Sequence, residues 1–211
     1  MIFFFSNRPP ILIKENGIWN AATYVWNPEQ NDAILTENGL ETHVTWLDAN
    51  GISRSTQNLV PTSNECITCH QSNGTLTPLG PTLRNLNRMV DVNGIQNNQI
   101  LQLQIKGLMT DFPVDQVPSI VDYKNALHPL EDRARAYLAM NCAHCHNPNA
   151  WEASAEIDFD FRYETPLNQT GLLFEQEDII DAVLEEEMPF IGTSIIDSEG
   201  IDLLVEYIES L

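Results

Sequence analysis

All four cysteines of the chain lie in two short clusters, and each cluster ends in a histidine. The clusters are Cys66-Ile67-Thr68-Cys69-His70 and Cys142-Ala143-His144-Cys145-His146. Two thiols three positions apart can add to the two vinyl groups of one haem, and the histidine that follows can bind the iron. The spacing therefore predicts two covalently attached haem c groups, with His70 and His146 as iron ligands.

Two other kinds of site use paired cysteines, but both leave the histidines without a role. A thioredoxin-like redox pair has the same Cys-x-x-Cys spacing within a strand-helix-strand context, which neither cluster has. A single zinc site needs four converging ligands, whereas the two pairs lie 142 − 66 = 76 residues apart in the sequence. Haem attachment is the interpretation that uses both cysteine pairs and both histidines.

Haem attachment also predicts a compartment. Thioether formation takes place outside the cytoplasm in bacteria, so we expect the mature protein to be periplasmic or otherwise extracytoplasmic. The segment at residues 1–10 is too short to contain the apolar region of an export signal, which predicts a processed, truncated or recombinant chain start. No run of eighteen apolar residues is present, so we expect no transmembrane segment.

The second iron ligand of each haem is predicted from methionine positions, because a thioether is a soft, neutral ligand for haem iron. Met188 lies 188 − 146 = 42 residues after His146 and just before a proline. For the first iron, Met109 is the leading candidate, since it lies 109 − 70 = 39 residues after His70. The other possibilities for that position are Met89, His43, His128 or no ligand at all. His144 is interpreted as a surface or propionate-side residue.

Two stretches near the clusters resemble known proteins. Leu79-Gly80-Pro81-Thr82-Leu83 follows the first cluster, and residues 133–138 with 141–146 read RARAYL and NCAHCH. The first stretch is similar to the Gly-Pro-x-Leu element of c-type cytochromes, which implies that the Pro81 carbonyl accepts a hydrogen bond from His70. The second resembles a poorly characterised bacterial family of dihaem proteins, in which a β-rich segment with tryptophan and tyrosine residues precedes the first haem.

The residues before Pro61 are expected to form that β-rich segment. β-branched and aromatic residues are frequent there, and three Asn-Gly pairs interrupt them: Asn16-Gly17, Asn38-Gly39 and Asn50-Gly51. An Asn-Gly pair can supply the two positive φ angles of a type I′ turn. The pattern predicts a small antiparallel sheet.

Beyond Pro61 the apolar residues recur with helical spacing, so helices are expected to position both clusters. The predicted apolar faces are Leu101, Ile105, Leu108 and Met109; Leu130, Ala134, Tyr137, Leu138 and Asn141; Ile179, Ile180, Val183 and Leu184; and Ile201, Leu204, Val205, Ile208 and Leu211. The second of these helices, at 130–141, leads directly into the second cluster. The last begins near Asp197-Ser198, which are candidates for its N-cap.

These elements predict a mainly α fold in which two cytochrome c-like haem units share a linking helix and follow a small antiparallel β segment. The expected division is a β-rich segment at 1–60, a first haem unit at 61–130 and a second at 131–211. The order of cluster, methionine and final helix in the second unit is similar to that of a single-haem cytochrome c domain.

The net charge of the chain restricts the kinds of partner that it can bind. The 211 residues include 10 Lys and Arg against 30 Asp and Glu, a net charge of −20, which disfavours binding to nucleic acid. Residues 152–211 hold seventeen of the acids and the single base Arg162. This part is expected to be a solubilising surface, a docking surface for a basic redox partner, or both.

The function expected from the two predicted haems is electron transfer between redox partners. The alternative is a dihaem peroxidase-like or other haem oxidoreductase with an open distal site on the first haem.

Overall fold

The N-terminal β-rich segment forms two antiparallel sheets. The computed structural model describes residues 10–27, 29, 31–48, 50–151, 159–191, 193 and 195–211, so the chain start at 1–9 lies outside the described residues. The strands β1 (Pro10–Glu15), β2 (Ile18–Trp26) and β3 (Ala33–Thr36) pair in that order. The second sheet is a hairpin of β4 (Leu40–Leu47) and β5 (Ser53–Val60). The prediction of antiparallel β structure in this segment is confirmed.

The first predicted turn has the expected conformation. Asn16 and Gly17 have φ angles of 50° and 85°, so the turn between β1 and β2 has the two positive φ angles of type I′. At the next pair Gly39 has a φ of 67°, and a Cβ there would come within 2.7 Å of the Val60 carbonyl oxygen. Only glycine fits this close approach of the two ends of the β4–β5 hairpin.

The middle of the chain corrects the predicted fold class, because the chain is a mixture of α and β and not mainly α. Two further antiparallel hairpins lie between short helices there. In chain order the elements are α1 (Cys66–Cys69), β6 (Gln71–Ser72), β7 (Thr75–Leu76), α2 (Leu83–Leu86), β8 (Met89–Val92), β9 (Ile95–Asn98), α3 (Gln99–Ile105) and the 3₁₀ turn η1 (Val114–Gln116).

The turns of these hairpins explain why the prediction of a mainly α fold is wrong in this part of the chain. Asn73-Gly74 and Asn93-Gly94 both have two positive φ angles, of 51° and 72° and of 56° and 81°, as type I′ turns require. The predicted helix around Leu101 is also shorter than its apolar pattern. Gly107, with a φ of 68°, follows the end of α3, so Leu108 and Met109 lie beyond the helix.

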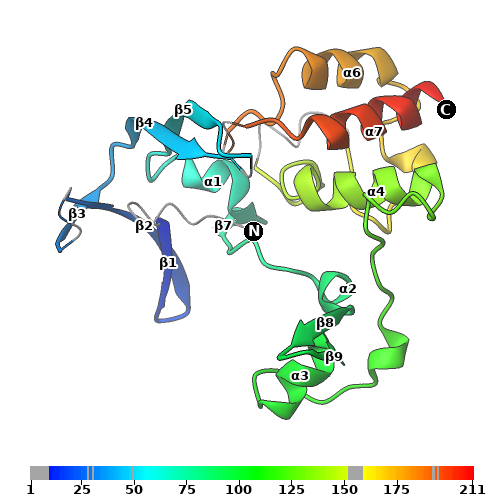
Figure 1. Ribbon diagram of the computed structural model, residues 1–211, viewed down its shortest axis with the longest axis horizontal. Helices are drawn as coiled ribbons and strands as arrows, with labels where there is room; N and C mark the ends of the chain where they lie inside the picture. Colours follow the sequence, from blue (N-terminus) through cyan, green and yellow to red (C-terminus); the bar gives the residue numbers. More distant parts are fainter. Residues whose placement is uncertain are drawn as a thin grey trace.

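The C-terminal part contains the predicted helices. They are α4 (Leu130–Asn141), α6 (Gln176–Leu184) and α7 (Ser198–Glu209), and a short 3₁₀ turn that was not expected, η2 (Leu167–Gln169), precedes α6. The bounds of α4 match the prediction, and the Asp197 carboxylate accepts a hydrogen bond from the Gly200 N–H as the N-cap of α7. Figure 1 shows α4, α6 and α7 side by side, with α1 between them and the β4–β5 hairpin.

The main hydrophobic core among the described residues lies where these three helices meet. Its members include Ala134, Tyr137, Leu138, Ala143, Phe161, Leu172, Ile179, Leu204 and Ile208. α4 and α7 cross so closely at Gly200 that a Cβ there would overlap the ring of Tyr137. The crossing therefore fixes α4 and the second cluster that follows it. None of the described helices combines the length and the apolar character that a membrane span needs.

Candidate functional site

The two clusters adopt the same helical turn. In the first, the His70 N–H donates to the Cys66 carbonyl at 2.9 Å, and in the second the His146 N–H donates to the Cys142 carbonyl at 2.9 Å. Residues three and four apart lie on one face of such a turn. Each cluster therefore presents two thiols and one imidazole in the same direction, as the predicted chemistry requires.

Local hydrogen bonds start each turn. Before α1, the Thr62 N–H donates to the Glu65 carboxylate at 2.7 Å, and the Glu65 N–H donates to the Thr62 hydroxyl at 3.2 Å. This reciprocal pair has the form of a capping box in the turn just before α1, whose own N-cap, Glu65, makes no side-chain cap bond. The second turn continues from α4, because the Cys142 N–H donates to the Leu138 carbonyl at 2.9 Å.

Tertiary structure brings the two clusters together. The Cys145 Sγ lies 3.7 Å from the Cys69 Sγ, and the Asn73 N–H donates to the Asn149 carbonyl at 2.9 Å. All four cysteines are free thiols, and all four are partly buried. The distance between the pairs along the sequence, which argued against a shared site, is therefore no measure of their distance in space.

His144 belongs to this junction and is not simply a surface residue, while its placement on the propionate side of a haem stays a prediction. One imidazole nitrogen of His144 and the sulfurs of Cys69 and Cys145 all lie within 4.8 Å of one another. The side chain is partly buried. In sequence it is an intervening residue of the second cluster, and only its contact with the first cluster marks it as a site residue.

The thiols at the junction differ in their pKa values. The pKa of Cys69 is lowered to about 5 because its thiolate accepts hydrogen bonds from Cys145 and then from His144. Burial raises the pKa of Cys142 to about 12. The pKa of Cys145 is raised because it donates to Cys69 and because it is buried. These opposite shifts favour Cys69 over Cys145 as the thiolate, which is the form that reacts and binds metals.

The imidazole of His146 lies in an aromatic pocket. Its ring centroid is 5.7 Å from that of Phe159 and 5.3 Å from that of Phe161, and the Phe161 N–H donates to the His146 carbonyl at 3.0 Å. Burial, and then the nearby His144, lower the pKa of His146, which keeps the ring neutral. Its Nδ1 is buried and has no hydrogen-bond partner among the described residues.

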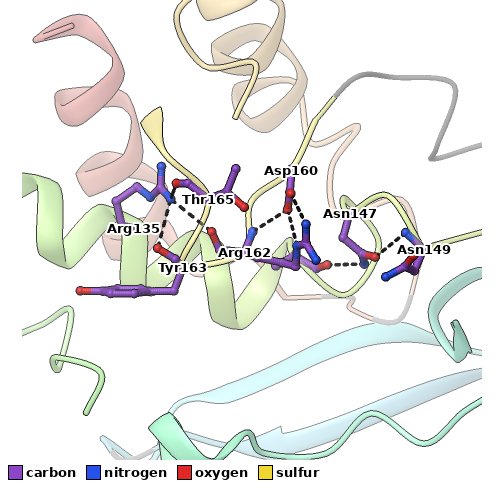
Figure 2. Close-up of polar contacts among 8 residues, drawn as sticks. Arg135, Asn147, Asn149, Asp160, Arg162, Tyr163 and Thr165 are labelled. Carbon is purple, nitrogen blue, oxygen red and sulfur yellow. Dashed lines mark hydrogen bonds and ion pairs between the residues drawn. The ribbon is translucent and has the colours of Figure 1, made fainter. Parts of the chain in front are cut away.

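Arg135 holds the loop that forms this pocket (Figure 2). This arginine of α4 is 6% exposed, and its guanidinium donates to the carbonyls of Arg162, Tyr163 and Thr165. Within the loop, Arg162 also forms an ion pair with Asp160. Phe159 and Phe161 lie in the same stretch of chain, so α4 positions both His146 and the rings that cover it.

His70 has a different environment. Its Nδ1 accepts a hydrogen bond from the Leu79 N–H at 3.4 Å. The resemblance to c-type cytochromes implies instead that this imidazole donates to the Pro81 carbonyl, two residues further along. The structure thus places the Leu79-Gly80-Pro81 stretch at His70, and the role given to Pro81 stays a prediction.

The candidate methionine ligands lie in two different places. Met188 is partly buried in the loop between α6 and α7, where its N–H donates to the Ala182 carbonyl at 2.9 Å. Met109 follows α3, and in Figure 1 the stretch from α3 to η1 lies well away from α1. Of the rivals, Met89 and His43 are exposed and His128 is partly buried. The assignments of Met188 and Met109 stay predictions.

The chain has no match among protein-family models, curated proteins or solved structures. Its function is therefore inferred from the residues of the site.

Proposed function

We propose that this chain is a dihaem c-type cytochrome that transfers electrons. The observation that supports the proposal best is that both Cys-x-x-Cys-His clusters form the same helical turn and meet in space. Each turn carries two free thiols and an imidazole on one face, which is the donor set that covalent haem attachment uses. When bound, each haem c supplies an iron that changes reversibly between Fe(III) and Fe(II).

The surroundings of the second cluster fit such a group. The His146 ring is partly buried and packs against two phenylalanines, which gives it the apolar surroundings that suit a haem. Apolar side chains that follow the first cluster or precede the second in the sequence are left exposed: Leu79 is 46%, Leu83 44% and Met140 54% exposed. An apolar cofactor attached there completes a core that the chain alone leaves open.

The residues of the chain have separate tasks in this proposal. Cys66, Cys69, Cys142 and Cys145 would form the thioether bonds, His70 and His146 would bind the irons, and Met188 would be a further ligand of the second iron. Phe159 and Phe161 exclude water from His146, while Arg135 holds their loop in place. Because the sulfurs of Cys69 and Cys145 are 3.7 Å apart, the two attachment points lie close together, which would favour electron exchange between the two groups.

We also propose that the protein acts outside the cytoplasm and that its partner is basic. The described surface around α6 is rich in exposed acids, including Glu177, Asp181, Glu185 and Glu187. Opposite charges steer diffusional encounter between redox partners, and salt weakens that steering.

The direct test is to count covalent haems in the exported protein. Intact mass and a pyridine haemochrome assay should give two haems per chain. The double variant Cys66→Ser/Cys69→Ser should retain one, and Cys142→Ser/Cys145→Ser should retain the other. A correctly exported protein that is colourless, or whose cysteines are joined to one another, would overturn the proposal.

One observation favours a second candidate, a peroxidase-like oxidoreductase. The stretch that carries Met109 lies away from α1 in Figure 1, which suits a first haem with an open sixth position. Such a haem should respond to cyanide and to peroxide in its ferric absorption spectrum. A fully low-spin spectrum with no response to either reagent would exclude this candidate and leave electron transfer.

A further inference from the structure

We propose that the chain, before any haem is attached, binds one zinc ion at the junction of the two clusters through Cys69, His144 and Cys145. This inference goes beyond the proposed function because it concerns the state in which the thiols are still free. It uses His144, which haem attachment does not need, and it leaves out Cys66 and Cys142. The ligand set therefore differs from that of either haem.

The distances fit a tetrahedral zinc site. Two sulfurs that bind one tetrahedral zinc at about 2.3 Å each lie roughly 3.8 Å apart. The sulfurs of Cys69 and Cys145 lie 3.7 Å apart. A disulfide requires its sulfurs at about 2.05 Å, so the junction has the spacing of a shared metal and not that of a bond. The His144 nitrogen lies within 4.8 Å of both sulfurs and would be the third protein ligand.

The three side chains are also of the types that bind zinc. Thiolates and imidazole are soft or borderline ligands, which favour zinc over magnesium or calcium. The three residues are partly buried, so water can occupy the fourth position. Zinc binds deprotonated thiols and neutral imidazole, and therefore zinc affinity should fall as the pH is lowered.

The site has a consequence for assembly. Zinc at this position links the turn of α1 to the turn after α4, in addition to the backbone bond from Asn73 to Asn149. Metal-bound thiolates are also protected from forming the wrong disulfide. Once Cys69 and Cys145 become thioethers they carry no charge and bind zinc poorly, so haem attachment and zinc binding exclude each other.

The test uses the full chain produced in a bacterial cytoplasm that lacks haem attachment, purified under reducing conditions. Elemental analysis should give one zinc per chain, and competition with a chromophoric chelator should give its affinity. Cys69→Ser, His144→Ala and Cys145→Ser should each weaken binding by more than the roughly 10–100-fold that a lost outer partner of a metal ligand costs. Cys66→Ser and Cys142→Ser are the matched controls, and both should keep one zinc.

The outcomes separate this inference from the proposed function. If the haem-free chain is unfolded without metal, far-ultraviolet circular dichroism should show it fold at one equivalent of zinc. A wild-type chain that binds no zinc, or a site lost equally in the Cys66 and Cys142 variants, overturns the inference. The exported His144→Ala variant should still carry two haems. An exported wild-type protein with zinc but no haem would instead overturn the proposed function.

Discussion

The crossing of α4 and α7 at Gly200 offers a sharp test of how the second haem unit is held together. A Cβ at Gly200 would lie 2.7 Å from the Tyr137 hydroxyl oxygen and closer still to two carbons of its ring. Tyr137 is 8% exposed, and its ring packs against Tyr123 with centroids 5.2 Å apart, so it has little room to move. Gly200→Ala should therefore overpack this crossing.

The expected size follows from two opposing effects. Overpacking of a core typically costs about 1–3 kcal/mol. Alanine in place of glycine in a helix returns about 0.8–1.0 kcal/mol. We expect a net loss of about 1–2 kcal/mol in the free energy of unfolding, since the overlap is with a buried ring and not with a flexible side-chain end. In a chain of this length that corresponds to a fall in Tm of roughly 2–8 °C.

The assay is chemical and thermal unfolding of the haem-loaded protein, with Gly80→Ala as the matched control. Gly80 has no atom within 4 Å of its would-be Cβ, so its substitution should change stability by less than about 0.5 kcal/mol. A Tyr137→Ala background removes the ring, and there Gly200→Ala should become neutral or stabilising. Equal destabilisation in both backgrounds, or none in the wild type, would refute the reasoning.

The remaining predictions concern the second iron and its pocket. Met188→Ala should lower the potential of one haem by on the order of 0.1 V or more, within the roughly 0.8 V that axial ligands span; an unchanged reductive titration would remove Met188 as a ligand. Arg135→Met should cost about 1–3 kcal/mol, because it leaves the carbonyls of the 162–165 loop without their donor. The exposed ion-pair variant Arg162→Met, whose side chain is 48% exposed, should cost about 0–1 kcal/mol; equal stability loss in the two variants would contradict the role given to Arg135.

The features that the sequence predicts correctly are those that depend on interactions between neighbouring residues. The helix Leu130–Asn141, the cap at Asp197 and the turn at Asn16-Gly17 each depend on residues close in the chain. The same is true of each Cys-x-x-Cys-His turn, because one helical turn brings positions three and four apart onto one face. Such features need no knowledge of distant segments.

The mainly α prediction failed where two local signals competed. Asn73-Gly74 and Asn93-Gly94 have the same turn chemistry as Asn16-Gly17, but the helical spacing of nearby apolar residues predicts helices in the same part of the chain. A short apolar pattern such as Leu101 to Met109 cannot by itself show that a glycine at positive φ ends the helix before the pattern does. Turn chemistry at Asn-Gly was the more reliable signal in this part of the chain.

Sequence alone thus determined which residues can carry the chemistry, since donor types and their spacing are local properties. Only the tertiary structure decided that Cys69 and Cys145 meet, that His144 joins them, and that Arg135 holds the phenylalanines over His146. These contacts join residues that are far apart in sequence. The Arg135 contact depends on the packing of α4, α6 and α7, and the meeting of the two clusters is accompanied by the backbone bond from Asn73 to Asn149. Spacing along the chain carries no information about such packing, because it depends on the burial of many side chains at once.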